Sequence, residues 1–308
     1  MGGAIGKRKL IIKRIKRHWQ LYALLLLPVT YLAVFCYWPM AGIQLAFKNF
    51  IATRGIWGSP WIGLSHFRRF FNSPSSLNVI FNTLFIGFYS VLAGFPMPIL
   101  LAIAINETKN KFFAKSVQMV TYMPYFISTV VMVSMIFQLL DTRIGLLGVL
   151  ANHLNITPVN ITGDSKYFVS LYVLSNVWQH TGYSAIIYVA ALSGVSQELR
   201  EASLIDGANT PQRIWHVDLP HIKQTIILVL LLTLGGIMNV GFEKVFLMQN
   251  PLNLSASEVI ATYIYKIALV SADYSFSTAV GLFNSLINMS LLLLVNAISK
   301  KIGETSLW

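Results

Sequence analysis

The sequence predicts an all-α, polytopic membrane protein with six transmembrane helices. Of its 308 residues, 55% are hydrophobic and only 11% are charged, whereas about a quarter of the residues in soluble domains are charged. Six apolar windows reach the roughly 20 residues that a helix needs to cross a bilayer. Basic residues are concentrated on one side of these windows, which is typical of membrane proteins with a defined orientation. We therefore expect a single transmembrane domain, 21–308, after a basic N-terminal segment, 1–20.

The six windows follow one another with short connections. They span residues 21–47, 79–105, 114–140, 167–192, 222–240 and 279–299. Prolines lie in or near several of them, at Pro28, Pro39, Pro96, Pro98 and Pro124. Membrane helices tolerate proline where neighbouring groups satisfy the freed carbonyls, so we expect curved helices that line a cavity. Gly235, Gly236 and Gly241 loosen the outer end of the fifth window.

The distribution of Lys and Arg predicts that both termini are cytoplasmic. Seven of these residues precede the first window: Lys7, Arg8, Lys9, Lys13, Arg14, Lys16 and Arg17. With this end inside, the inner segments hold fifteen of the 23 basic residues. The outer loops hold the other eight, Lys48, Arg54, Arg68, Arg69, Arg143, Lys166, Lys244 and Lys266. Such an excess marks the cytoplasmic side. The first window is too long for a signal peptide and lacks a small-residue cleavage site, so it is expected to remain as an anchor.

The sequence carries no motif for covalent chemistry, and we expect no catalytic residue, metal site or cofactor in this chain. It has no GxxxxGK[ST], HExxH or CxxC pattern. Its one cysteine, Cys36, cannot form an intrachain disulfide or a structural metal site. The basic N-terminus lies next to an apolar span, which indicates anionic membrane lipid as its partner and not nucleic acid. We expect His180 and His216 to be interfacial polar residues near span ends.

The predicted spans lack a series of ionisable groups. Ion-coupled carriers usually bury such groups to hold the driving ion, and the one acidic residue near a span, Glu243, is expected at the outer end of the fifth window. Energy for any transport would therefore have to come from elsewhere. One class of protein to consider is a secondary transporter that works without other subunits. Such a transporter requires inverted repeats and a coupling-ion site, and neither is visible in the sequence.

A polar stretch, EASLIDGANTPQRIWHVDLP, lies between the fourth and fifth windows at residues 201–220. It could be an ordinary cytoplasmic connection at about 193–222 whose charged residues are solvated. However, its order of residue types resembles the "EAA" coupling loop of bacterial ABC importer permeases. The residues that carry the resemblance are Glu201, Ala202, Asp206, Gly207, Ala208, Leu219 and Pro220. The chain departs from the commonest form of the motif only at Ser203, where a second alanine is usual.

The resemblance extends over nearly the whole chain and is to type I ABC importer permeases of the carbohydrate class. It is carried by NTLFIGFYS, TYMPYFIS, NVWQHTGY and ATYIYKIALVSADYSFSTAVGL. Together with NVGFEKVFLMQNP, the last stretch resembles the branch that handles complex, plant- or alga-derived oligosaccharides. This resemblance implies the type I permease fold in the bacterial cytoplasmic membrane and a non-catalytic role as half of a translocation pathway. The implied partners are a second, homologous permease, two ATPase subunits that bind the ATP and Mg, and an extracytoplasmic solute-binding protein.

The same resemblance implies a role for the polar loop. It would form two short helices, one of which is seated in a cleft of the ATPase subunit. Glu201 would make a charge-assisted contact with that subunit, and Gly207 would permit the sharp turn between the helices.

Polar and aromatic residues in the windows are candidates for a sugar pathway, because sugars bind to aromatic faces and to a few polar groups in an otherwise apolar cavity. The candidates are Tyr125, Asn176, Trp178, Gln179, Tyr183, Asn239, Glu243, Asn284 and Asn288. Alternatively, Tyr and Trp form an interfacial belt while Asn side chains bond neighbouring helices. The cargo could also be an amino acid, a peptide or phosphate in place of a sugar.

Overall fold

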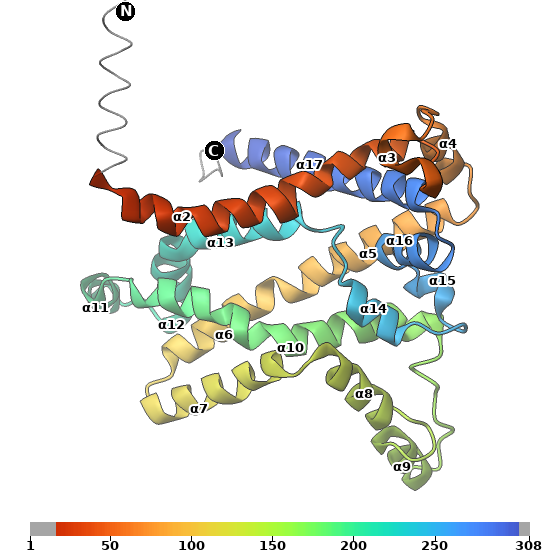
Figure 1. Ribbon diagram of the computed structural model, residues 1–308. Coiled ribbons are helices and arrows are strands. Elements are labelled where there is room, and N and C mark those ends of the chain that lie inside the picture. The colour runs from red at the N-terminus through yellow and green to blue at the C-terminus, as the bar shows by residue number, and fades with distance from the viewer. Residues whose placement is uncertain (1–16, 302–308) are drawn as a thin grey trace, which may run out of the picture.

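A computed structural model describes residues 17–301, which form helices and connecting loops (Figure 1). Within this range the single β-bridge pairs Lys48 with Trp61. The predicted basic segment, apart from residues 17–20, lies outside the described residues. Four helical runs between residues 17 and 301 are long and apolar enough to cross a membrane, and one sharply bent pair of helices makes a fifth.

The first membrane-length run is continuous but irregular. It consists of α2 (Trp19–Tyr31), the π-helical η1 (Leu32–Tyr37) and the 3₁₀-helical η2 (Trp38–Phe47). No residue of α2 is buried, and the run packs within the chain mainly through η2 against the last helix. Three short elements follow at the outer end: η3 (Ala52–Arg54), α3 (Gly55–Gly58) and α4 (Ser65–Phe71).

The second run matches its predicted window closely. It comprises α5 (Ser76–Gly94) and α6 (Pro96–Glu107). Pro96 begins α6, where its missing N–H is tolerated.

The third predicted window, 114–140, is not one straight helix. Its parts are α7 (Lys111–Tyr122), the 3₁₀ turn η4 (Met123–Phe126) and α8 (Thr129–Leu139), and the chain bends by 100° between them. Pro124 lies in η4, and Ser128 is extended and caps α8 by accepting a hydrogen bond from the Val131 N–H. The carbonyl of Ile127, freed by the break, accepts a 2.9 Å hydrogen bond from the Gln179 amide. A side chain from another helix therefore satisfies the broken backbone, as an apolar environment requires.

The fourth window corresponds to α10 (Ser165–Ser193), which follows the short α9 (Leu146–His153). Asp164 caps α10 by accepting a hydrogen bond from the Lys166 N–H. The helix has 29 residues and packs against α5, α6 and α7. Its length suffices to cross a membrane, but its mean hydropathy is below that of the other runs because polar residues occupy its middle.

The fifth window ends earlier than predicted. A short helix, α11 (Gln197–Ile205), precedes a continuous helical run made of α12 (Thr210–Arg213), η5 (Ile214–Asp218) and α13 (Leu219–Gly235). The chain leaves the helix at Gly235 and Gly236, well before residue 240. It continues as α14 (Phe242–Met248), α15 (Leu254–Ser257), α16 (Ile260–Tyr265), η6 (Lys266–Val270) and the long α17 (Tyr274–Lys301).

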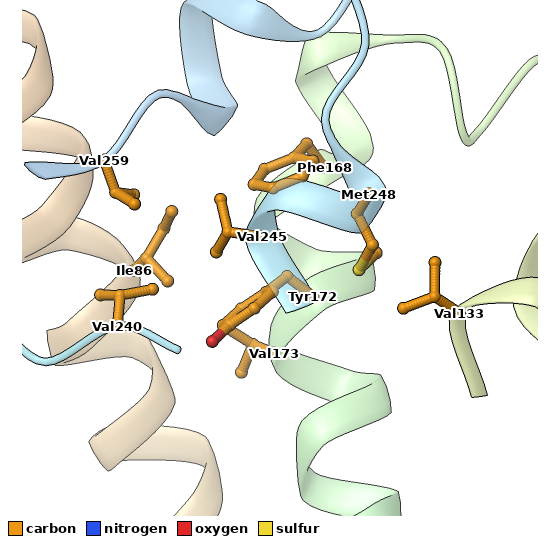
Figure 2. Close-up of a cluster of buried hydrophobic side chains, with 9 residues drawn as sticks. All are labelled: Ile86, Val133, Phe168, Tyr172, Val173, Val240, Val245, Met248 and Val259. Atoms are coloured by element: carbon orange, nitrogen blue, oxygen red, sulfur yellow. The ribbon is translucent and has the colours of Figure 1, made fainter. Parts of the chain in front are cut away.

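α14 packs against α8, and its Val245 and Met248 join an apolar cluster with side chains of α10. Figure 2 shows the apolar cluster that holds it there. Its buried members are Ile86, Val133, Phe168, Tyr172, Val173, Val240, Val245, Met248 and Val259. Because lipid tails are as apolar as these side chains, close packing holds the cluster together more than exclusion from water does.

The predicted inner and outer segments lie at opposite ends of the bundle. The start of α2, the turn between α6 and α7, α11 with α12, and the end of α17 all lie at one end (Figure 1). α3, α4, α9 and α15 lie toward the other end. The segments predicted to be cytoplasmic thus share one end of the molecule.

Gly182 allows α7 and α10 to approach closely. A Cβ atom at this position would lie 2.0 Å from the carbonyl oxygen of Thr121. We expect Gly182→Ala to destabilise the protein by about 1–3 kcal/mol, the usual cost of overpacking. Gly94→Ala is the matched control, because its new Cβ would meet only Val177 at 3.8 Å. Thermal midpoints of both variants in one detergent test this, and equal midpoints would contradict a rigid α7–α10 contact.

Candidate functional site

The polar loop folds as a helix–turn–helix at the inner end of the bundle. Ser196 caps α11 by accepting from the Glu198 N–H. Asn209 and Gln212 form a reciprocal capping box at α12, with hydrogen bonds of 2.9 and 3.0 Å. Between the helices, Gly207 has a φ of 81°, in the left-handed region that favours glycine. The sharp turn expected at Gly207 is therefore present.

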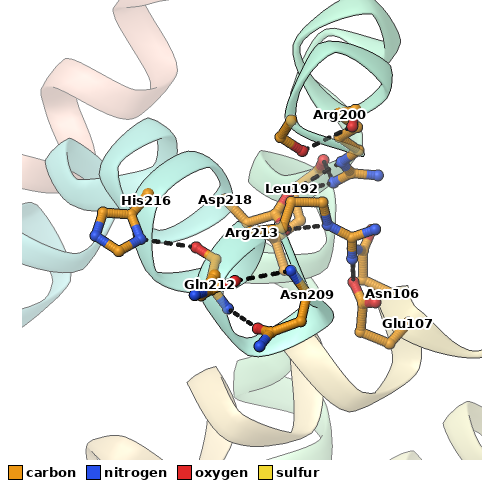
Figure 3. Close-up of polar contacts among 10 residues, drawn as sticks. Asn106, Glu107, Leu192, Arg200, Asn209, Gln212, Arg213, His216 and Asp218 are labelled. Atoms are coloured by element: carbon orange, nitrogen blue, oxygen red, sulfur yellow. Dashed lines mark hydrogen bonds and ion pairs between the residues drawn. The ribbon is translucent and has the colours of Figure 1, made fainter. Parts of the chain in front are cut away.

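A buried carboxylate joins the two short helices. The Asp218 side chain is 1% exposed and lies 2.9 Å from Arg200 of α11 and 3.4 Å from Arg213 of α12 (Figure 3). Arg200 also donates to the carbonyl of Leu192 at the end of α10. Removing one partner from a buried ion pair leaves an uncompensated charge and costs about 3–5 kcal/mol. The position of both helices therefore depends on Asp218.

The same network also contacts α6, which belongs to the second membrane run. Arg213 forms an ion pair with Glu107, the last residue of α6 (Figure 3). We call Glu107, Arg200, Arg213 and Asp218 the inner clamp. It links the helix–turn–helix to α6 directly and to α13 through η5, so a displacement of the loop is passed to both.

The outward face of the helix–turn–helix carries charge and apolar surface. Glu201, Ala202 and Asp206 are exposed, and Gln197 donates a 3.0 Å hydrogen bond to the Glu201 carboxylate. Ile205 is 87% exposed. Other large apolar side chains exposed in this region are Leu199, Leu204 and Trp215. A soluble connection would not display so much apolar surface, so this face is suited to contact another protein.

The remaining motif residues lie in three different surroundings. Ala208 and Gly207 line a cavity of about 460 Å³ together with Ser203. Leu219 packs on the apolar cluster that includes Tyr188 and Ile222. Pro220 is exposed in the first turn of α13.

Two cavities adjoin the middle of α10. The α5–α10–α13 cavity, about 430 Å³, is bounded by Gly87, Tyr188 and Thr233. The α10–α14 cavity, about 490 Å³, is bounded by Tyr125 and Lys244. Both volumes are in the range of small-molecule sites. Both cavities are also lined by Tyr172, Asn176, His180 and Gly241, so they lie on two sides of the same stretch of α10.

The structure brings together most of the predicted pathway residues. Tyr125, Asn176, Gln179 and Glu243 line the α10–α14 cavity, while Asn176 and Asn239 line the α5–α10–α13 cavity. Trp178 and Tyr183 line neither cavity, and Trp178 is 54% exposed. Tyr183 instead stacks on Tyr125 with ring centroids 3.8 Å apart.

The asparagines of α17 make helix-to-helix contacts. Asn288 donates to the Asn239 side chain at 2.9 Å and accepts from the Met238 N–H at 3.2 Å. The Oδ1 atom of Asn284 is buried with no hydrogen-bond partner among the described residues. Neither residue lines the two cavities at α10.

The expectation for one polar residue is wrong, and two charged residues lie on α14. His180 does not lie at a span end but midway along α10, where its Nδ1 is 3.0 Å from the Asn176 carbonyl. Lys244, which was predicted in an outer loop, lies on the short helix α14 and lines the α10–α14 cavity, as does Gln179. Glu243 likewise lies on α14 and not at the end of a continuous span.

The inner clamp was also not anticipated. Arg200 and Asp218 are 18 positions apart, and only the fold brings them together. The sequence feature that could have indicated this ion-pair network is Asp218, a single acidic residue directly before Leu219 and Pro220 that follows two arginines. Among residues 17–301 no cluster of three or more His, Cys, Asp or Glu side chains could hold a metal ion.

Comparison with known proteins gives consistent matches. Residues 94–304 match the family described as "Binding-protein-dependent transport system inner membrane component". The chain is 37% identical over 302 residues to the polygalacturonan/rhamnogalacturonan transport system permease protein YteP of Bacillus subtilis (strain 168), covering 98% of this chain and 94% of that protein. A chain of a bacterial ABC transporter involved in the import of the acidic polysaccharide alginate superposes with a TM-score of 0.89 at 37% identity, covering 95% of this chain and 99% of that chain.

A second crystal structure, of a bacterial alginate ABC transporter in complex with an alginate pentasaccharide-bound periplasmic protein, also has a TM-score of 0.89. Its matching chain is 36% identical, and the superposition covers 96% of this chain and 99% of that chain.

We expect Asp218→Asn to destabilise the protein by about 3–5 kcal/mol, because Arg200 and Arg213 would lose their shared charge. Asp206→Asn is the matched control, since Asp206 is exposed and makes no ion pair within the described residues. Thermal unfolding of the purified variants measures the difference. Equal midpoints for the two variants would show that the clamp does not stabilise the loop.

Proposed function

The chain belongs to the family of binding-protein-dependent transport system inner membrane components, and we propose that it forms half of the translocation pathway of an ATP-driven oligosaccharide importer. The observation that carries this proposal is the helix–turn–helix at residues 196–218, which exposes Glu201 and Ile205 while the buried Asp218 fixes its base. An exposed element clamped to the membrane helices is suited to receive a push from a soluble subunit.

We propose six membrane spans for this multi-pass inner membrane permease. Five are the four apolar runs and the bent pair α7–α8, and the sixth is α10, which is too polar to be identified as a span from its composition. Its 29 residues suffice for a crossing. Polar groups in the middle of a membrane helix are tolerated when they face the bundle interior, and Asn176, Gln179 and His180 line cavities there. With six spans both termini lie on one side, together with the helix–turn–helix and most of the basic residues.

We propose a partner for each task that this chain does not perform alone: completing the pathway, hydrolysing ATP and delivering the sugar. A second, homologous permease would complete the pathway, and two ATPase subunits would dock on the helix–turn–helix loops. An extracytoplasmic binding protein would deliver the sugar, as a periplasmic protein does in the matching alginate transporter. The chain itself is non-catalytic, so ATP and Mg would be bound by the ATPase subunits.

The coupling would be mechanical. Closure of the ATPase subunits displaces the helix–turn–helix, and the inner clamp passes this displacement to α6 through Glu107 and to α13 through Asp218. Both helices border the α5–α10–α13 cavity. Rocking these helices against the second permease would open the cavity to one side of the membrane at a time.

We propose acidic oligosaccharides as the substrate class. Of two relatives that match nearly the whole chain, one is a permease of a polygalacturonan/rhamnogalacturonan transport system and the other belongs to a transporter that imports the acidic polysaccharide alginate. All of these polymers contain uronic acid residues. The two cavities at α10 offer the mixture of aromatic and amide groups that sugars require. Uptake of labelled tetragalacturonate and of a neutral maltotetraose by the assembled importer in proteoliposomes tests this. Uptake of the neutral sugar alone would contradict the proposed class.

Glu201→Lys is expected to weaken co-purification of the ATPase subunit from detergent, because it replaces attraction by repulsion at the docking face. Glu198→Lys, one turn earlier on α11 and also exposed, is the control for the change in net charge. A loss of about tenfold in retained ATPase is expected for Glu201→Lys at low salt. Equal retention by both variants through a salt titration would exclude Glu201 from the docking contact.

Substitution of Gly207 should separate coupling from folding. No atom lies within 4 Å of a Cβ built at this position, so the backbone φ alone limits what fits. Asn tolerates the left-handed conformation whereas a β-branched residue does not. We therefore expect Gly207→Val to reduce uptake several-fold at normal yield and Gly207→Asn to retain most of it. Normal sugar uptake by Gly207→Val or by Gly207→Trp would contradict a required turn.

A further inference from the structure

Lys244 is a buried cation in the interior of the bundle. It is 5% exposed, and its Nζ atom has no hydrogen-bond partner among the residues that the structure describes. Its ammonium group lies over the ring of Tyr172, 5.2 Å from the centroid. No carboxylate of residues 17–301 forms an ion pair with it, although Glu243 is its neighbour in sequence. A buried charge that lacks a counter-ion is costly, so its retention calls for a function.

The position of Lys244 connects it with the pathway. It lines the α10–α14 cavity, as do Gln179 and His180, which lie midway along α10. An ionisable residue at this depth of a membrane protein is by default part of a substrate or ion route. The flexible lysine side chain can move its ammonium group from the Tyr172 ring toward the cavity without any change in the backbone.

The cavity also contains one carboxylate, that of Glu243, and its other polar groups are suited to the neutral parts of a sugar. His180 directs Nδ1 at the Asn176 carbonyl, which leaves its Nε2 atom for a sugar hydroxyl. Tyr125 lines the cavity with one ring face covered by Tyr183. Gln179 has its amide nitrogen engaged by Ile127 and retains its side-chain oxygen as an acceptor. Lys244 is the one lysine or arginine among the described residues that line this cavity.

We propose that Lys244 binds the carboxylate of a uronic acid residue as the oligosaccharide passes through the α10–α14 cavity. The carboxylate replaces the Tyr172 ring as the partner of the ammonium group, so the cation is held by a weak contact when the cavity is empty of sugar and by a charge-assisted hydrogen bond when it is occupied. This inference rests on the proposed function, and it assigns the selection of acidic over neutral sugars to one residue of the membrane pathway.

The test uses the assembled importer, with its binding protein and ATPase subunits, in proteoliposomes supplied with labelled tetragalacturonate. Lys244→Met keeps the length of the side chain and removes the charge, while Lys244→Arg keeps the charge. We expect Lys244→Met to lower kcat/KM for uptake about tenfold or more and Lys244→Arg to retain most of it. Yield and basal ATP hydrolysis, measured on the same preparations, report assembly.

Chemical rescue distinguishes charge from shape. Cys36 is the only cysteine of the chain, so Cys36→Ser provides a background in which Lys244→Cys can be modified selectively. An aminoethyl thiosulfonate reagent adds an ammonium group to Cys, and an ethyl reagent of similar size adds none. Uptake should recover with the aminoethyl reagent alone, and neither reagent should alter the Cys36→Ser parent.

Several outcomes would overturn the proposal. Undiminished tetragalacturonate uptake by Lys244→Met, or equal recovery with both reagents, would exclude a role for the charge. Loss of assembly in Lys244→Met together with no recovery by the aminoethyl reagent would assign Lys244 a structural role. If the unsubstituted importer takes up no tetragalacturonate, the proposed substrate class fails, and the role of Lys244 fails with it. If the unsubstituted importer takes up tetragalacturonate and Lys244→Met takes it up equally well, the role of Lys244 is excluded while the proposed substrate class stands.

Discussion

The arrangement of the inner half of this permease depends on one buried carboxylate. Asp218 holds Arg200 and Arg213 on two different short helices, and Arg213 in turn contacts Glu107 at the end of α6. A buried ion pair is rarely the most stabilising solution for a given position. Here it adds a directional contact to elements that also share an apolar cluster, which includes Ala102 of α6, Val217 of η5 and Ile222 of α13. A rigid base for a docking element is what transmission of force requires, and an apolar contact of the same size would be less specific in direction.

Irregular backbone occurs where the cavities lie. The third membrane segment breaks at Ile127 and Ser128, and α13 ends at Gly235 before the chain continues into α14. Non-helical backbone at membrane depth is tolerated only where protein or a cavity satisfies it. The Gln179 amide and the Tyr172 hydroxyl provide this, because they bond the Ile127 carbonyl and the Gly241 N–H respectively. The breaks create the space in which polar residues can face one another.

The sequence allowed the membrane segments and the loop motif to be predicted, since both depend on local residue types. The windows at 79–105, 167–192 and 279–299 lie within α5–α6, α10 and α17. The bend at Ile127 and Ser128 and the early end of α13 were missed, because hydropathy does not report the direction of the chain. The inner clamp could not be predicted, since an ion pair across 18 positions depends on tertiary structure that no local pattern encodes.

The hydrogen bond between Gln179 and Ile127 has a consequence for how such permeases can diverge. Gln179 forms part of the cavity wall, yet its amide nitrogen is committed to a backbone carbonyl. Replacing Gln179 by a residue without an amide would leave the Ile127 carbonyl without its hydrogen bond, whereas, among the described residues, the side chains of Asn176 and Lys244 hold no such backbone group. Evolution toward new sugars is thus expected to leave an amide donor at residue 179 and to act on its neighbours. The cavity wall thus contains a residue that supports the backbone, Gln179, and residues that do not, such as Asn176 and Lys244.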